Sequence, residues 1–198
     1  MGSAENIDIR PGTVADVPVV LEFLDKAVRW LVARGRPGQW GTEPLSARPR
    51  LHASTSDAAR AGNLFLAYLG EQPVGALTVG DTPAYVPPAP EPELYVNLLV
   101  TDRDHPGHNV GGRLLDHARQ LGRARGAVLL RVDCYAGDDQ ALIRYYERQG
   151  FQRVTRFEVA REDAPAWPGQ LLQDRLDDAA SHRGRHDLRI RPEISRFA

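Results

Sequence analysis

Apolar residues near the start of the chain recur every three or four positions, the spacing that places them on one face of a helix. This stripe consists of Val17, Leu21, Leu24, Val28 and Leu31. Thr13 precedes it as a helix N-cap with Asp16 three residues later, and Gly35 follows it as a stop signal. The pattern predicts a helix after Thr13, and the alternation over 7–10 predicts a short strand before it.

Strand-like runs alternate with turn signals through the middle of the chain. The runs 64–69 and 74–80 are joined by 70–73, whose Gly and Pro predict an antiparallel hairpin. A helix near 48–61 is expected before them. The prolines between 83 and 92 then predict a stiff connection that is neither a helix nor the interior of a strand.

A strand, a glycine-bearing loop, a helix and a second strand follow one another in the second half. The strand is expected at 93–101, and it runs into the loop 104–112. The helix ends before Gly126, and the next strand covers 127–134. This β-α-β order implies two parallel neighbouring strands and a right-handed crossover. One more helix and two more strands are expected at 138–149, 151–160 and 170–176.

The composition of the 198 residues is that of one globular domain, with 42% hydrophobic and 26% charged residues. No apolar run reaches the roughly 18 residues of a membrane span, and residues 1–10 lack the regions of a secretory signal. A net charge of -1 provides no field for nucleic acid. Cys134 is the only cysteine, which excludes an internal disulfide and a multi-cysteine zinc site. We therefore expect a cytoplasmic chain.

The end of the chain differs from the rest. From residue 177 the sequence is polar, rich in arginine and without a period, so we expect a domain over 1–176 and a peripheral tail over 177–198. Residues 181–198 carry five arginines against two acidic residues, a net +3, which leaves -4 on the remainder. Such a tail can mediate dimer contacts, bind an anionic partner or remain solvated, and these alternatives stay open.

The segment Gly107-His108-Asn109-Val110-Gly111-Gly112 lies between the expected strand and helix. Backbone N–H groups at a helix start have no internal partners, and glycine allows a ligand to approach the backbone closely, so the loop suits a phosphate. The segment lacks the Gly-Lys-Ser/Thr of a Walker loop and the spacing of a dinucleotide fingerprint, which disfavours ATP and NAD. A purely structural turn is the alternative interpretation.

The stretch from Tyr95 to Leu115 resembles motif A of the GCN5-related N-acetyltransferases, the GNAT family. Its loop follows the family pattern Arg/Gln-x-x-Gly-x-Gly/Ala over 106–111. Pro106 stands where Arg or Gln is usual, and Asn109 replaces a glycine. Asparagine adopts the left-handed backbone more readily than most residues, so the loop mechanism is retained.

Two further segments resemble the same family. The stretch 139–151 is similar to motif B, with Asp139 at the usual asparagine position, and the stretch 9–16 resembles the first strand-to-helix turn. The resemblance covers about residues 7–176. It implies the GNAT fold, an α+β architecture with a mixed, mostly antiparallel central sheet and helices on both faces.

The resemblance implies acetyl-CoA as cosubstrate, with its pantetheine arm paired to the first of two splayed strands. In this arrangement 99–101 line the arm and polarise the thioester carbonyl, and the N–H groups of 108–113 take the pyrophosphate. The implied cofactor contacts are Leu99, Val100, Thr101, His108, Asn109, Val110, Gly111, Gly112, Arg113, Asp139 and Tyr146. No metal is expected, because His105 and His108 have no cysteine partner.

Proton transfer is the second requirement of the implied reaction. Tyr146 falls on the family tyrosine that protonates the departing thiolate, and packing against Leu142 is its alternative role. Glu93 shares a strand face with Tyr95 and Asn97 and is the only carboxylate among them. It is the candidate base acting through water, and an exposed charge at the end of a loop is the alternative.

Residues around the expected opening are candidates for contact with the acceptor. Substrate contacts are expected from Trp30, Trp40, Tyr95, Asn97 and Asp133. Tyr145 is expected in the core or in the acceptor wall, and Cys134 as a buried, inert thiol rather than a site of covalent acetylation.

The resemblance thus implies an N-acetyltransferase that passes acetyl directly from acetyl-CoA to a primary amine of a small molecule, such as an antibiotic, an amino acid or a polyamine derivative. A protein or peptide amine is the alternative acceptor, and a non-catalytic acyl-CoA-binding regulator is the alternative class. The expected partner is the small-molecule substrate, with no nucleic acid and no membrane, and a homodimer is left open.

Overall fold

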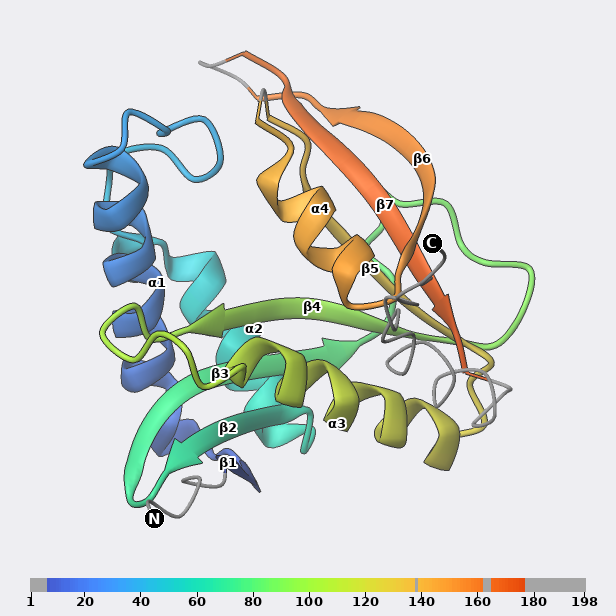
Figure 1. Cartoon of the computed structure of the whole chain (residues 1–198), viewed down its shortest axis with the longest axis horizontal. Coiled ribbons are helices and arrows are strands. Elements are labelled where there is room, and N and C mark those ends of the chain that lie inside the picture. The colour runs from blue at the N-terminus through green and yellow to red at the C-terminus, as the bar shows by residue number, and fades with distance from the viewer. Residues whose placement is uncertain (1–6, 138, 162–164, 177–198) are drawn as a thin grey trace, which may run out of the picture.

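The structure of the protein is a computed structural model that describes residues 7–137, 139–161 and 165–176. One sheet of seven strands has the order β1-β2-β3-β4-β5-β7-β6 (Figure 1). Its strands are β1 (Ile7–Pro11), β2 (Leu64–Leu69), β3 (Gln72–Gly80), β4 (Glu93–Thr101), β5 (Leu129–Tyr135), β6 (Gln152–Val159) and β7 (Trp167–Arg175). The β4–β5 pair is parallel and all other pairs are antiparallel, which confirms the fold class expected from the sequence.

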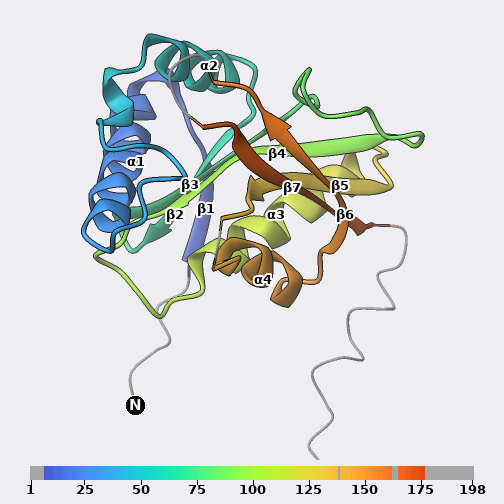
Figure 2. The same ribbon diagram turned by 90° about the horizontal axis from the view of Figure 1, so that it is seen from above.

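The helices lie in two layers, one on each face of the sheet (Figure 2). They are α1 (Val17–Val32), α2 (Pro49–Arg60), α3 (Val110–Ala124) and α4 (Ala141–Arg148), with short 3-10 turns η1 (Val14–Asp16) and η2 (Leu45–Ala47). The apolar face of α1 packs with α2 against β2, β3 and β4, whereas α3 and α4 pack against the opposite face. Among the helices of the described residues, none combines the length and apolar content needed to cross a membrane.

The capping predicted at the first helix is confirmed. The carboxylate of Asp16 accepts hydrogen bonds from the backbone N–H of Thr13 at 2.7 Å and from its hydroxyl at 2.9 Å. The 3-10 turn η1 separates this cap from α1. The helix near 48–61 and the strand at 93–101 are also found, as α2 and β4.

Several boundaries differ from the sequence-based expectation, among them the start of β5 at Leu129 rather than 127. The second hairpin strand begins at Gln72 rather than 74, because Gly70 in a left-handed conformation closes the turn early. The helix α4 begins at Ala141 rather than 138, because Gln140 has a φ of 47° and cannot be part of it. The last described strand begins at Trp167 rather than 170. The tail over 177–198 lies outside the described residues.

Arg119 of α3 is buried, although an arginine in a surface helix is usually exposed. The guanidinium of Arg119 pairs with Asp174 of β7 at 2.7 Å and with Asp116 at 2.8 Å, and it also donates to the carbonyl of Gln149. A buried charge is tolerated because each of its three nitrogen atoms donates a hydrogen bond. The pair joins α3 to β7 and to the end of α4.

Candidate active site

The two central parallel strands are paired at one end and separated at the other. Backbone pairing between β4 and β5 runs from Glu93 opposite Leu129 to Val96 opposite Val132. Beyond it, β4 continues along β3 and β5 continues along β7, so the two strands diverge (Figure 1). The register of the β3–β4 pair shifts at Asn97, and such a bulge bends a strand. On its β5 side, the part of β4 from Asn97 to Thr101 therefore faces an opening, while its other side remains paired with β3.

The glycine loop reaches this opening at the start of α3. Asn109 is the N-cap residue, with φ 52° and ψ 33°, which confirms the left-handed conformation expected of it. Gly107 has a φ of 93°. A Cβ atom on Gly112 would overlap the side chain of Asn109, so a larger residue there would displace that side chain. The first N–H groups of α3 have no intrahelical partners and can bind an anion.

Tyr145 lies against the same loop, which is more specific than the core or wall position expected from the sequence. A Cβ atom added to Gly111 would overlap the Tyr145 hydroxyl, and it would lie 3.7 Å from the methyl group of Thr101. Burial raises the pKa of Tyr145 to about 12. The phenol is therefore a neutral neighbour of the first helical turn, and Thr101 and Gly111 are brought together there.

Tyr146 is placed in the core beside the opening. Its ring is 5.3 Å from that of Tyr145 and 5.6 Å from that of Phe151, both in edge-to-face geometry. Burial raises its pKa well above the ordinary value, and the nearby Cys134 acts in the same direction. Its phenol therefore stays protonated, as a proton donor requires. Burial also raises the pKa of Cys134 to about 12, so its thiol is not a thiolate near neutral pH.

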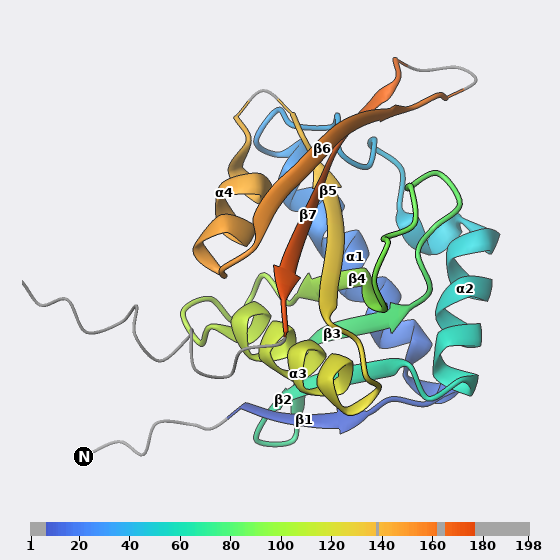
Figure 3. The same cartoon turned by 90° about the vertical axis from the view of Figure 1, so that its right-hand side faces the viewer.

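Asp133 stands at the first position of β5 beyond the paired segment. Its Oδ1 accepts a hydrogen bond from the Tyr95 hydroxyl at 2.6 Å, and the Tyr85 hydroxyl lies 3.4 Å from each of its oxygens. Burial raises the pKa of Asp133, although the two hydrogen bonds oppose this. The structure thus brings together Tyr95 and Asp133, two of the expected acceptor contacts, and adds Tyr85 from the proline-rich connection. Figure 3 shows that connection on the α1 and α2 side of the sheet.

Glu93, the expected base, lies at the paired end of the same two strands. Its carboxylate accepts hydrogen bonds from Arg131 at 2.7 Å, from the Thr82 hydroxyl at 2.6 Å and from the Ala89 N–H at 3.2 Å. Burial alone would raise its pKa, but these hydrogen bonds together lower it. Four residues of strand, about 13 Å, separate Glu93 from Asn97, where the opening begins. Its contacts fasten the proline-rich connection to β5.

The other expected acceptor contacts are held elsewhere. The ring of Trp30 lies between the guanidinium groups of Arg34 and Arg103, 4.1 and 4.2 Å from its centroid. Trp40 packs, partly buried, on the α1 side of the core. Exposed Asn97 donates a hydrogen bond to the carbonyl of Asp81 at 3.0 Å. The contacts of these three side chains are therefore with loops and with the core, and none of these contacts is with Asp133, Tyr95 or Tyr85.

The loop between α1 and η2 (residues 33–44, the α1–η2 loop) is tied across the open end. Arg36 pairs with Asp139 at 2.5 Å, and the Gln39 carbonyl accepts a hydrogen bond from the Trp167 indole at 3.0 Å. A Cβ atom on Gly38 would overlap the Tyr135 hydroxyl, which shows how closely the loop approaches β5. The other oxygen of Asp139 caps α4 by accepting from the Ala141 N–H at 3.1 Å.

An aromatic row lies beside this loop and was missed by sequence reasoning. Its ring centroids are 5.8 Å apart for Tyr85 and Phe157, 6.3 Å for Phe157 and Trp167, and 5.9 Å for Trp167 and Tyr135. The alternation of residues on β5 is the one sequence signal for this arrangement, because it places Tyr135 on the same face of the strand as Asp133. Nothing in the sequence predicts that Tyr85 and Phe157 meet.

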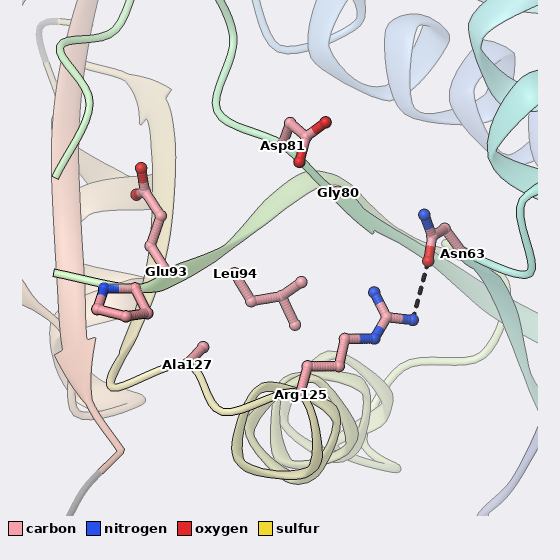
Figure 4. A pocket seen from close by; sticks show the side chains of 8 residues that line it. Asn63, Gly80, Asp81, Glu93, Leu94, Arg125 and Ala127 are labelled. Carbon is pink, nitrogen blue, oxygen red and sulfur yellow. Dashed lines mark hydrogen bonds between the residues drawn. The ribbon is translucent and has the colours of Figure 1, made fainter.

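A cavity of about 260 Å³ lies away from the opening, beside the start of β4. Asn63, Asp81, Leu94 and Arg125 are among its lining residues, and Arg125 donates a hydrogen bond to Asn63 at 2.9 Å (Figure 4). Glu93 also borders it, but its carboxylate is held by Arg131. This cavity has neither the unpaired strand nor the glycine loop of the open end.

A family model described as the acetyltransferase (GNAT) family matches residues 26–151. The chain belongs to this family. It is therefore a GNAT N-acetyltransferase with acetyl-CoA as its cosubstrate. The matched region contains the glycine loop, both central strands and α4.

Solved structures have the same fold at low sequence identity. A Salmonella typhimurium protein solved with its cofactor acetyl-CoA is 18% identical, with a TM-score of 0.61, over 88% of this chain and 96% of its own. The ribosomal-protein-alanine N-acetyltransferase from Brucella melitensis is 22% identical, with a TM-score of 0.61, over 85% and 99%. The Drosophila melanogaster polyamine N-acetyltransferase is 20% identical, with a TM-score of 0.60, over 86% and 100%. No curated protein matches the chain by sequence.

Proposed function

We propose that this GNAT enzyme transfers acetyl to the primary amine of a small molecule. The α1–η2 loop carries this proposal, because its ties to Asp139, Trp167 and β5 span the open end from one side to the other. A closed end of this kind limits the acceptor to a compact molecule, whereas a folded protein or a peptide needs an open groove. The neighbours named above act on a protein and on polyamines, so family membership alone leaves the acceptor open.

The glycine loop is proposed to bind the pyrophosphate of acetyl-CoA through the N–H groups of 108–112. The N–H of Arg113, expected to join them, instead donates to the Asn109 carbonyl at 3.0 Å. The backbone of 99–101 would hold the pantetheine arm as an added strand, since that edge of β4 has no strand partner in β5. Asp139 would contribute through the start of α4, which it caps. The chain thereby aims the thioester at the space beside Asp133 and Tyr146.

Tyr146 is proposed as the acid that protonates the departing thiolate. Replacing Tyr146 by Phe should lower kcat by about 10² while the Kd for CoA changes less than about threefold, because a proton donor is lost and little contact area changes. Thiol release measures the first quantity and calorimetry the second. Tyr68→Phe is the matched control, because Tyr68 lies on β2, where its ring packs against the guanidinium of Arg10 on β1. An unchanged kcat would remove Tyr146 from this role.

The loop assignment is tested by Gly111→Val. The added side chain should weaken CoA binding about tenfold or more, since it occupies the space beside the first helical N–H groups and meets the Tyr145 hydroxyl. Tyr145→Phe alone should bind CoA normally. The double variant removes the overlapping hydroxyl, so it should fold better but still bind weakly. Equal affinity of Gly111→Val and the unaltered chain would refute the loop as the phosphate site.

The acceptor class is tested by a screen of primary amines and short peptides with acetyl-CoA, followed by thiol release. Transfer to small amines with little transfer to peptides is the expected result. A clear preference for peptides would contradict the proposal.

A further inference from the structure

Two carboxylates on β4 and β5 face the same side of the sheet, and only one of them has a cation. Glu93 pairs with Arg131, two residues before Asp133 on β5. Arg131 also donates to the Pro87 carbonyl at 3.1 Å, so it is engaged at the paired end. Within the described residues, the side-chain partners of the Asp133 carboxylate are two phenols, its own backbone N–H also interacts with it, and no ion pair includes it.

The donors around Asp133 are all neutral, so its carboxylate keeps its charge uncompensated and can accept a further, charged donor. A carboxylate has about four acceptor sites, and the Tyr95 and Tyr85 hydroxyls take a short bond and two long ones. Tyr95 is fully buried, whereas Asp133 is partly exposed and Tyr85 is 50% exposed. A charged ligand can therefore reach Asp133 from the open side, where it finds a preoriented negative charge.

The aromatic row supplies a second, independent part of the same site. Tyr85 belongs both to the row and to the hydrogen-bonded group around Asp133. Phe157, Trp167 and Tyr135 extend the row along the sheet, and all three are partly exposed. Such rings bind an apolar carbon body and attract a cation through their faces.

We propose that Asp133, held by Tyr95 and Tyr85, binds the ammonium group of the acceptor, while the aromatic row binds its carbon body. This inference rests on the proposed small-amine transferase function and narrows its substrate class. The acceptor is a primary alkylamine or arylalkylamine that carries no carboxylate beside the amine, because a second negative charge would be repelled by Asp133. An α-amino acid is a poor acceptor for this site.

Asp133 also takes part in proton transfer. The ammonium gives one proton to its carboxylate, and the freed lone pair then forms the N–C bond with the thioester carbon. As the C–S bond breaks, the sulfur takes a proton from Tyr146. The second proton of the nitrogen restores the Tyr146 phenol through solvent when the amide forms, and Asp133 releases its proton to solvent. One CoA thiol, one amide and one net proton result for each ammonium consumed.

The kinetic test compares Asp133→Asn with Asp57→Asn, a substitution of an exposed acid on α2 that pairs with Arg60. With hexylamine or 2-phenylethylamine, Asp133→Asn should raise the amine KM about 10²-fold and lower kcat, while the KM for acetyl-CoA stays within threefold. Tyr95→Phe should raise the amine KM about tenfold with a smaller change in kcat, because Tyr95 positions Asp133. Melting temperatures verify that each variant is folded.

A binding test separates this inference from the proposed function. Titration of either amine should quench the fluorescence of the unaltered chain with CoA present, through Trp167, and Asp133→Asn should abolish the quench. Failure of both amines to bind, or an unchanged amine KM and affinity in Asp133→Asn, overturns the ammonium site even if CoA binds normally. Absence of CoA binding would instead refute the proposed function, and amine binding would still support the site at Asp133.

Discussion

The paired and open ends of the β4–β5 pair use similar residues in opposite ways. At the paired end a carboxylate meets a guanidinium, and the hydrogen bonds of Glu93 fasten the proline-rich connection to β5. At the open end the backbone of β4 has no partner in β5, and the carboxylate of Asp133 meets two phenols. The first arrangement neutralises its charge within the chain, and the second leaves a charge for a ligand.

The contrast underlies our proposal that Asp133, rather than the sequence candidate Glu93, accepts the proton. Glu93 shares a strand face with Tyr95, so period-two alternation made it a reasonable candidate. Its pKa is lowered by three hydrogen bonds, whereas burial raises the pKa of Asp133. The carboxylate with the raised pKa is the better proton acceptor, and it is the one at the opening.

The largest stability effect is expected at the paired end. Arg131→Met leaves Glu93 without its cation, so the free energy of unfolding should fall by about 3–5 kcal/mol, measured by urea denaturation. Asp133→Asn should change it by less than about 1 kcal/mol, because Asn still accepts the Tyr95 hydrogen bond. If the free energy of unfolding fell more for Asp133→Asn than for Arg131→Met, the structural role would belong to Asp133 rather than to the Glu93–Arg131 pair.

Glu93→Gln should also lower the free energy of unfolding, but by less than Arg131→Met. The amide keeps an acceptor for the Thr82 hydroxyl but loses the charge that Arg131 requires, so we expect a loss of about 1–3 kcal/mol in unfolding free energy. The kcat for amine acetylation should stay within threefold of the unaltered chain. A loss of 10² in kcat in a folded variant would restore Glu93 as the base.

The two carboxylates should also differ in their pH dependence. The folded pKa of Glu93 lies below its unfolded value, so its contribution is present above about pH 4.3 and is lost as pH falls through the folded pKa. The folded pKa of Asp133 is raised, so the folded state gains stability relative to Asp133→Asn as pH falls from neutral towards about 4. Urea denaturation of both single variants across pH checks the opposite signs.

The smallest effect is expected at Cys134. Its buried thiol, with a pKa raised to about 12, is not a nucleophile at neutral pH. Cys134→Ala should keep kcat within about twofold, and intact mass spectrometry with acetyl-CoA should find no acetylated enzyme. Stoichiometric acetylation lost in Cys134→Ala would show a covalent intermediate instead of direct transfer.

Sequence pattern predicted most of the fold because the dominant signals are local. The stripe from Val17 to Leu31, the glycine at 126 and the run 93–101 each mark one element through their own periodicity or turn chemistry. The left-handed Asn109 followed from its residue type and the loop pattern. Gln140 has no such preference, so its left-handed conformation and the late start of α4 could not be predicted.

The candidate site was only partly predictable, because its decisive contacts join distant parts of the chain. Tyr85 lies 48 residues from Asp133, in a connection with no periodicity. The indole of Trp167 meets Gln39 across 128 residues. The Arg119–Asp174 pair likewise depends on the position of β7. These contacts follow from topology rather than from local sequence.

A crystal structure of the chain with CoA tests the central contrast most directly. We predict that the pyrophosphate accepts hydrogen bonds from the N–H groups at the start of α3, and that the pantetheine arm lies along 99–101 with its thiol directed to the space between Asp133 and Tyr146. CoA bound instead in the cavity beside Asn63 and Arg125, or an opening filled by side chains with no room for the arm, would contradict the account.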